Sequence, residues 1–446
     1  MFSNYLLLIS EISGQADNYV IRSYLDSIFN DLIKKNYITQ YSFLFSKEKT
    51  MTFTSSEIHQ IRTETDATKH LIHFNNAGAA LMPNAIRDAM IGYIQYEANH
   101  GSYETAAKFK VQIEHTYDAI AELINAQREE IAIVENATVA WHMAFHSLNF
   151  RKGDVILTSE AEYASNYISF LQAKKRRGIV IKVIPNDKHG QVDVNALAEM
   201  IDSQVKLIAV TYIPTNGGLI NPAIAIGKIA RKNKVPYLLD ACQAVGQIPV
   251  DVREIGCDFL SATGRKYLRG PRGIGFLYVR KVWLDAGLEP IFLDLHAAEW
   301  TSQGKYKMRP DARRFENWEN NLAGKYAFGL AIDYALSIGI ERLSKRLCDL
   351  AAQLREKLET IEGVTVHDIG EQKGGIVSFS MAGKQRDNII KYLAEHQINV
   401  SAIDRNGTLI EMTNRGLKDD LIRASIHYYN TNKEIERFCE VLSAFE

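Results

Sequence analysis

The chain has 446 residues, of which 46% are hydrophobic and 24% are charged. These proportions are typical of folded globular proteins and exclude a largely disordered, collagen-like or coiled-coil chain. The 52 Lys and Arg residues nearly balance the 53 Asp and Glu residues, so the charge favours neither nucleic acid nor an anionic membrane as a partner. The length predicts two or more structural units with at least one large core, and we expect small-molecule partners.

The cysteines and the start of the chain bear on where the protein works. The four cysteines form no CxxC motif, so neither a disulfide framework nor a cysteine zinc site is predicted; they are Cys242, Cys257, Cys348 and Cys439. The apolar run from Tyr5 to Ile9 is short and has no preceding basic region, which makes it a poor signal peptide. No run approaches the length of a membrane span. We therefore expect a cytoplasmic protein without membrane contact.

Residues 1–68 differ from the rest of the chain. They contain no proline, and their apolar residues recur at helical spacing through Tyr19, Ile21, Tyr24, Leu25, Ile28 and Leu32. We interpret this segment as an appended N-terminal helical extension.

From Val155 onward, short apolar runs alternate with amphipathic stretches such as Tyr163 to Arg177 and Ala223 to Asn233. The runs expected to form strands are 155–157, 179–184, 207–210, 236–239, 259–260 and 274–279. Apolar strands that alternate with helices predict an α/β fold whose largely parallel sheet is covered on both faces.

The polar region 301–321 is interpreted as a long loop, and long loops in compact domains are often functional. Its basic residues are Lys305, Lys307, Arg309, Arg313 and Arg314, and they either recognise an anionic substrate side chain or are simply solvated. Beyond it, Phe328 to Leu358 has a strongly helical pattern, and the segments 375–381, 386–396 and 421–446 again alternate strand and helix. These patterns divide the chain into the extension 1–68, a large domain 69–330 and a smaller α+β domain 331–446.

The clearest chemical signal is the pair Asp240 and Lys266. An apolar strand that ends in Asp240 places a carboxylate at the C-terminal edge of a parallel sheet, where open α/β folds bind ligands. Lys266 follows the next predicted strand, directly after Thr263, Gly264 and Arg265. The combination suits pyridoxal 5′-phosphate, whose aldehyde forms a Schiff base with lysine and whose pyridinium nitrogen pairs with aspartate. Thr263 and Arg265 could then bind the phosphate.

At these residues the sequence resembles the class V aminotransferase family of fold type I pyridoxal-phosphate enzymes. The resemblance runs from Glu162 through Lys266 and resumes at Arg423 to Asn430. It is strongest for the branch that holds group II cysteine desulfurases, selenocysteine lyases, isopenicillin N epimerases and ergothioneine-pathway C–S lyases. The resemblance implies a large domain with a mostly parallel seven-stranded sheet and a smaller α+β C-terminal domain.

The resemblance also implies roles for individual residues around the cofactor. Lys266 becomes the Schiff-base lysine and proton shuttle, and Asp240 the partner of the pyridine nitrogen. Gln243 matches the residue that hydrogen-bonds the phenolic oxygen, and Tyr163 the aromatic residue that stacks on the ring. The phosphate site is made up of Ala137, Thr138, Thr263 and Arg265.

The substrate side of the site follows from the same resemblance. Thr215 or Asn216 matches an asparagine near the cofactor, and Arg423 matches the arginine that binds the substrate α-carboxylate. Asn76 belongs to an N-terminal turn, Asn75 to Gly78, that lines the substrate pocket. Residues 316–321 correspond to a loop that reaches the neighbouring subunit's site in relatives, which implies a homodimer with shared active sites.

One departure from the family pattern concerns sulfur. Desulfurases of this branch carry a persulfide-forming cysteine in a loop before the carboxylate arginine, whereas residues 400–417 contain no cysteine. We therefore expect a C–S β-lyase, similar to hercynylcysteine sulfoxide lyases or cysteine-conjugate lyases, in which an external aldimine forms and Lys266 removes the α-proton. An epimerase or aminotransferase with the same residues, and a non-catalytic scaffold, remain alternatives.

A metal site is not expected. His142 and His146 are four residues apart and could face the same way on a helix, a geometry that metals use. No glutamate follows the first histidine, and the predicted helix packs near the cofactor phosphate.

Overall fold

The computed structural model describes residues 51–418 and 420–445, so most of the predicted extension 1–68, including its apolar pattern from Tyr19 to Leu32, lies outside the described residues. Residues 51–446 form one compact unit. The division between a large domain 69–330 and a small domain 331–446 therefore stays a prediction.

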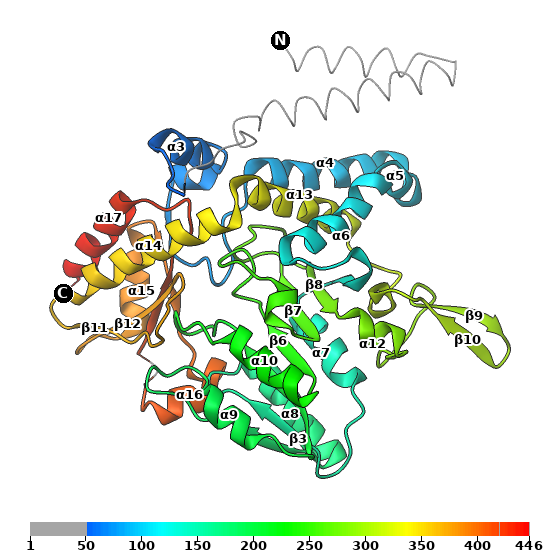
Figure 1. Ribbon diagram of the computed structural model, residues 1–446. Coiled ribbons are helices and arrows are strands. Elements are labelled where there is room, and N and C mark those ends of the chain that lie inside the picture. Colours follow the sequence, from blue (N-terminus) through cyan, green and yellow to red (C-terminus); the bar gives the residue numbers. More distant parts are fainter. Residues whose placement is uncertain (1–50, 419, 446) are drawn as a thin grey trace, which may run out of the picture. The chain divides into compact units, whose positions relative to one another are not determined.

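The central feature of the unit is a seven-stranded sheet with strand order β2-β8-β7-β6-β5-β3-β4 (Figure 1). Its strands are β2 (Ile131–Val134), β3 (Val155–Thr158), β4 (Val180–Val183), β5 (Val205–Thr211), β6 (Tyr237–Asp240), β7 (Phe259–Thr263) and β8 (Gly275–Val279). β8 runs antiparallel to both of its neighbours, β2 and β7, and the other strand pairs of the sheet are parallel. The predicted mostly parallel sheet is confirmed; β2 was not among the predicted strands.

Helices cover both faces of this sheet, because its strands are apolar on both sides. On one face, Trp141 of α7 (Ala137–Ser147) and Phe170 of α8 (Ala164–Arg177) pack in one core cluster with Leu238 of β6. Tyr237 precedes Leu238 in the strand and so points to the opposite face, where α10 (Ala223–Asn233) lies against it at Gly227. The predicted helices of the alternating pattern are thus confirmed.

Further helices complete the unit. They are α3 (Ser55–Thr63), α4 (Asn84–His100), α5 (Ser102–Lys108), α6 (Lys110–Ile124), α9 (Val194–Met200), α11 (Val252–Ile255), α12 (Lys281–Asp285) and α13 (Leu322–Ile338), with 3-10 turns η1 (Asp66–Lys69), η2 (Arg128–Glu130) and η3 (Ala312–Phe315). The predicted helix 328–358 is two helices, because Gly339, whose φ of 99° favours glycine, separates α13 from α14 (Ile340–Glu359). Between residues 51 and 445, no helix is both long and apolar enough to cross a bilayer.

The C-terminal part of the chain forms a separate four-stranded sheet in the order β11-β12-β15-β14. The elements of this C-terminal part of the chain are β11 (Val364–Val366), β12 (Ile376–Met381), α15 (Arg386–Glu395), β13 (Ile398–Asn399), β14 (Ser401–Ala402), η4 (Arg405–Thr408), α16 (Leu409–Asn414), β15 (Ile422–Ser425) and α17 (Asn432–Ser443). The short β1 (Ile72–His73) pairs in parallel with β13, far away in sequence. This pairing brings the turn after β1 next to β15.

The region 301–321, predicted to be a long loop, contains regular structure. Strands β9 (Ala298–Ser302) and β10 (Lys305–Met308) form an antiparallel hairpin that projects from the body of the unit (Figure 1), and η3 follows it. Arg309 pairs with Asp311 and Arg313 pairs with Glu114. Three of the five basic residues are therefore bound by the chain itself, since Arg314 also donates to backbone carbonyls.

Glu316 was predicted to begin a loop that reaches a neighbouring subunit, but its side chain is buried within its own chain. It pairs with Lys325 at 2.9 Å and accepts hydrogen bonds from the Tyr117 hydroxyl and the Ile133 amide. Burial by itself would raise the pKa of Glu316. The charge of Lys325 and the surrounding hydrogen-bond donors outweigh this effect and lower the pKa to about 2. Glu316 is thus an internal ionic anchor between α6, β2 and α13.

We predict that Glu316→Gln lowers the free energy of unfolding by about 3 kcal/mol, because it leaves the buried Lys325 charge unpaired. The depressed carboxyl pKa means that the contribution is complete above the ordinary pKa of 4.5 and is lost as the pH falls toward 2. Urea unfolding at pH 7 and at pH 3 measures both effects. The exposed Glu319→Gln is the control, and equal stability of the two variants at pH 7 would contradict the assignment.

Candidate active site

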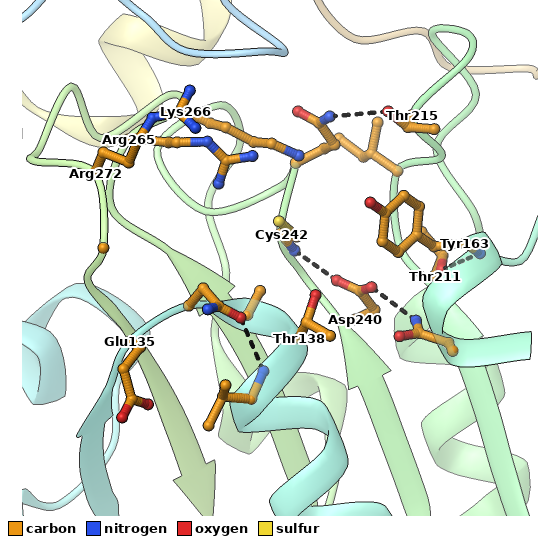
Figure 2. Close-up of a pocket in the computed structure, with 17 residues that line it drawn as sticks. Glu135, Thr138, Tyr163, Thr211, Thr215, Asp240, Cys242, Arg265, Lys266 and Arg272 are labelled. Carbon is orange, nitrogen blue, oxygen red and sulfur yellow. Dashed lines mark hydrogen bonds between the residues drawn. The ribbon is translucent and has the colours of Figure 1, made fainter. Parts of the chain in front are cut away.

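A cavity of about 490 Å³ opens at the carboxyl ends of the parallel strands (Figure 2). The residues that line it are Glu135, Asn136, Ala137, Thr138, Val139, Tyr163, Asn166, Thr211, Ile213, Thr215, Asp240, Cys242, Gln243, Arg265, Lys266, Arg272 and Gly273. Eight predicted site residues are among them. The edge of the sheet is where open α/β folds bind ligands, as the sequence analysis expected.

Asp240 is the last residue of β6, so the strand itself delivers its carboxylate to the cavity. One oxygen, Oδ1, accepts a hydrogen bond from the Cys242 amide at 2.9 Å, and Oδ2 accepts one from Asn166 Nδ2 at 2.8 Å. Burial raises the pKa of Asp240. A cationic group in the cavity would therefore stabilise the ionised carboxylate, as a pyridinium nitrogen does.

Lys266 lies in a tight turn after β7. The turn is closed by hydrogen bonds from the Arg269 amide to the Lys266 carbonyl and from the Gly270 amide to the Gly264 carbonyl. The side chain is only 8% exposed. Burial lowers the pKa of Lys266, and the nearby guanidinium groups of Arg265 and Arg423 lower it further, against the opposing effects of Cys242 and Asp240. The neutral amine, which is the nucleophilic form, is thereby favoured.

The N-terminus of α7 forms another wall of the cavity. Asn136 caps the helix by accepting a hydrogen bond from the Val139 amide. The amides of Ala137 and Thr138, in the first turn, have no acceptor within the helix by its geometry, and both residues line the cavity. Arg265 lines the same cavity and donates from Nη1 to the Thr263 hydroxyl at 3.3 Å. Thr263 itself is not among the lining residues, and its hydroxyl donates to the Ile274 carbonyl at 3.3 Å, so the predicted contact of Thr263 with the phosphate has no geometric support. The amides of Ala137 and Thr138, the Thr138 hydroxyl and the Arg265 guanidinium are suitable donors for a phosphate.

Gln243 and Tyr163 lie where the cofactor ring is predicted. Gln243 Nε2 donates to the Ala77 carbonyl at 3.1 Å, while its buried Oε1 has no hydrogen-bond partner among the described residues. Nε2 also donates to the Thr215 hydroxyl at 3.5 Å, so donation to a phenolic oxygen would replace this long hydrogen bond. The Tyr163 ring stands above the Asp240 carboxylate (Figure 2) and is 37% exposed. An aromatic face at this position can cover a ring without acting as an acid or base.

The structure separates the two candidates Thr215 and Asn216. Thr215 lines the cavity, and its hydroxyl and carbonyl accept hydrogen bonds from Arg423 Nη1 at 2.9 and 2.8 Å. Asn216 instead donates to the Thr408 hydroxyl and to the Asp404 carbonyl, away from the cavity lining. Of the two residues, Thr215 is therefore the candidate contact for the cofactor or the substrate.

Arg423, on β15, is buried beside the cavity rather than in its lining. Its Nη2 lies 3.5 Å from Asn75 Oδ1, and its buried Nε has no hydrogen-bond partner within the described part of the chain. No carboxylate there pairs with it, and burial lowers its pKa. A buried guanidinium without an acidic partner is a suitable receptor for a substrate carboxylate.

Asn76 does not face Arg423. Its Nδ2 donates to the carbonyls of His73 and Ser425, and its Oδ1 accepts from the Tyr429 hydroxyl. All of these partners belong to the chain itself, so Asn76 fixes the turn and leaves Asn75 next to Arg423. The predicted contact of Asn76 with substrate therefore has no geometric support, and Asn75 is the better candidate.

The residues present fit pyridoxal phosphate. Three buried polar atoms lack hydrogen-bond partners among the described residues: Gln243 Oε1 and Arg265 Nε in the cavity lining, and Arg423 Nε beside it. Buried polar groups are rarely left unpaired, so the site is shaped for a polar ligand. The donors for a phosphate, the carboxylate for a ring nitrogen and the low-pKa lysine for an aldehyde surround the same space.

Several residues of the cavity lining were not among the predicted site residues. Thr211 ends β5 beside the strand that ends in Asp240, so the same strand-end rule would have found it. Asn166, in the first turn of α8, follows Glu162 by four residues, and the two side chains are hydrogen-bonded at 2.8 Å. Cys242 was considered only for disulfides and zinc, yet among the four cysteines it is the one that lines the cavity.

The two histidines of α7 lie outside this cavity. His142 Nε2 is 2.7 Å from the Ser169 hydroxyl, and both histidines line a separate cavity of about 340 Å³ with Arg176 and Arg177. Burial lowers the pKa of His146 to about 4, and the neighbouring arginines lower it as well. In the described ranges, no three His, Cys, Asp or Glu side chains are grouped as metal ligands.

Comparisons with known proteins agree with this geometry. The family model described as aminotransferase class-V matches residues 72–438. The chain is 30% identical over 387 residues to a probable cysteine desulfurase of Methanothermobacter thermautotrophicus, covering 86% of this chain and 96% of the relative. It is 30% identical over 390 residues to a probable cysteine desulfurase of Pyrococcus abyssi, with the same coverages.

Two solved structures are also similar. An apo cysteine desulfurase from Thermococcus onnurineus has a TM-score of 0.79 and 28% identity, covering 86% of this chain and 97% of the other. The cystine C–S lyase C-DES, in complex with cysteine persulfide, has a TM-score of 0.77 and 22% identity, covering 85% and 99%, and supports the fold alone. The family model covers most of the chain, and the relatives at 30% identity are matched over nearly their full length. The chain therefore belongs to the class V aminotransferase family and is an enzyme that depends on pyridoxal 5′-phosphate.

Proposed function

We propose that the protein is a C–S β-lyase that acts on a cysteine-derived amino acid. The observation that carries the proposal is that Lys266 and Asp240 line one cavity and that Arg423, buried beside it, has no acidic partner among the described residues. Lys266 can bind the cofactor aldehyde, which also reacts with the substrate amine; Asp240 can pair with a ring nitrogen, and Arg423 can bind a carboxylate. An α-amino acid and the cofactor carry all three groups.

Each residue has a distinct task in this proposal. Arg423 binds the substrate carboxylate, oriented by its hydrogen bonds to Thr215. Bound pyridoxal phosphate acts as an electron sink for the α-carbon. Lys266, whose pKa is lowered by burial, accepts the α-proton. Asp240 holds the positive charge of the ring nitrogen. The sulfur substituent then leaves the β-carbon with its bonding electrons and takes up a proton. Water hydrolyses the remaining unsaturated amino acid to pyruvate and ammonia, and no catalytic cysteine is needed.

The finer assignment, a lyase similar to hercynylcysteine sulfoxide or cysteine-conjugate lyases, is supported by residues 400–417. These residues contain no cysteine that could receive sulfur. Thr408, at the end of η4, accepts a hydrogen bond from Asn216 and donates one to Glu411. This segment is therefore joined to the Thr215–Asn216 loop, where it can contact a substrate side chain.

A cysteine desulfurase is the second candidate, because two relatives at 30% identity carry that name. The thiol of Cys242 lines the cavity and interacts with Lys266. Burial raises its pKa, which disfavours the nucleophilic thiolate and favours the lyase. Epimerisation and transamination would use the same residues.

The homodimer with shared active sites also remains part of the proposal. The projecting β9–β10 hairpin and its flanks expose large apolar side chains, including Trp300 at 79% and Leu295 at 71% exposure. Exposed apolar surface of this kind is typical of protein interfaces.

Product analysis tests the reaction. We expect pyruvate and ammonia from cysteine thioethers or cysteine sulfoxides, and the same turnover from Cys242→Ala, because no thiol takes part. The measurement quantifies pyruvate, ammonia and alanine from a panel that includes free cysteine. Alanine from cysteine, lost in Cys242→Ala, would instead identify a desulfurase, and no product from any thiol compound would favour an epimerase or aminotransferase.

Covalent attachment of the cofactor tests Lys266. Borohydride reduction of the loaded protein, followed by peptide mapping, should place the pyridoxyl group on Lys266, because this lysine lines the cavity and burial lowers the pKa of its amine. Lys266→Ala should lose this label and activity, and the exposed Lys174→Ala should keep both. A label on another lysine would refute the assignment. Full activity of Lys266→Ala would show that Lys266 is not the catalytic lysine, whereas a wild-type protein with neither label nor activity would favour the non-catalytic scaffold.

Carboxylate recognition tests Arg423. We predict that Arg423→Lys lowers kcat/KM by about tenfold or more, through KM, since a lysine cannot replace the planar bidentate donor. Preference for the amino acid over the amine that lacks its carboxylate should fall by the same factor. Arg386→Lys, a partly exposed arginine paired with Asp387, is the control. An unchanged preference would show that another residue binds the carboxylate.

A further inference from the structure

A second carboxylate, that of Glu162, is buried behind Asp240. Glu162 is 3% exposed and Asp240 is 4% exposed. Asn166 of α8 joins them, because its Nδ2 donates to Asp240 Oδ2 at 2.8 Å and to Glu162 Oε1 at 2.8 Å. The two hydrogens of one amide group are thus divided between two carboxylates.

The other contacts of Glu162 are also donors. Its Oε1 accepts from the Thr211 hydroxyl at 2.7 Å and from the Tyr163 amide at 3.2 Å, and Oε2 accepts from the Thr158 hydroxyl at 3.0 Å. No side chain of the described residues forms an ion pair with Glu162. Burial raises its pKa to about 7, and the charge of Asp240 adds to the effect. Placing a carboxylate here is costly, so neutral packing alone does not account for it.

The arrangement fixes which way Asn166 points. An amide that turned over would direct its carbonyl oxygen at Asp240 and repel it, and the demand of Glu162 for a hydrogen opposes that rotation. With Nδ2 held toward Asp240, both carboxylate oxygens of Asp240 have a fixed donor, Asn166 on Oδ2 and the Cys242 amide on Oδ1. The carboxylate then cannot rotate away from the cavity that it lines.

We propose that Glu162 and Asn166 are positioning residues for Asp240: Glu162 orients the Asn166 amide, and Asn166 holds the Asp240 carboxylate toward the ring nitrogen of bound pyridoxal phosphate. The inference rests on the pairing of Asp240 with that nitrogen, which is part of the proposed function. Neither residue acts on the substrate, so the effect is expected in cofactor recognition.

The test compares equilibrium binding of two cofactors to the apo form of the full chain. One is pyridoxal phosphate, and the other is its deaza analogue, in which carbon replaces the ring nitrogen. The wild-type protein should prefer pyridoxal phosphate. Glu162→Gln and Asn166→Ala should each reduce this preference by about tenfold, the order expected for one hydrogen bond to a charged group. Glu160→Gln is the matched control, since that carboxylate accepts from Asn186 and not from Asn166.

A ratio of two affinities within one variant separates positioning from general damage. Equal losses for both cofactors in Glu162→Gln and Asn166→Ala would show a merely structural role and overturn the inference. If one variant does not fold, the ratio in the other decides. Asp240→Asn tests the underlying assumption: an unchanged preference there would refute its role in the proposed function, whereas a lost preference there with intact preference in Glu162→Gln and Asn166→Ala would refute this inference alone.

Discussion

The burial of Asp240, Lys266 and Arg423 at one edge of the large sheet is the constraint on which the site depends. Each has a pKa displaced by burial away from its charged form, and none forms an ion pair with another side chain in the described part of the chain. Such groups are costly to bury without partners. A ligand that brings a cation, an aldehyde and a carboxylate offsets that cost, so binding should stabilise the fold as well as prepare the reaction.

Asp240 and Arg423 come from two different sheets, which must lie next to each other to form the site. Asp240 comes from β6 of the seven-stranded sheet and Arg423 from β15 of the four-stranded sheet, and the Thr215 loop joins them through its hydrogen bonds to Arg423. The Lys266 turn is tied to the same region by Arg269, which has a φ of 58° and donates from a buried guanidinium to Leu81 and Tyr428. A positive φ in a residue other than glycine is uncommon, so the surrounding contacts must hold this turn in place.

The choice between lyase and desulfurase concerns the fate of sulfur, not the activation of the α-carbon. Residues 400–417 offer no thiol, and Thr408 joins this segment to Asn216. Cys242 does offer a thiol within the cavity, but burial keeps it in its protonated form. The same fold and the same lysine serve both reactions, which explains why similarity to desulfurases leaves the product open.

The sequence by itself determined the sheet, the cofactor and much of the cavity wall. Apolar runs alternating with amphipathic stretches predicted the parallel strands, and the residues at their ends, Asp240 and the Lys266 turn, follow from chain order. The tertiary structure alone decided which neighbours face the cavity. In the folded chain, Asn216 is hydrogen-bonded to Thr408, and Asn76 donates a hydrogen bond to the Ser425 carbonyl. Glu316 is buried against Lys325. Asn166 joins Glu162 to Asp240. These outcomes depend on side-chain direction and on pairing between distant segments, which local periodicity does not encode.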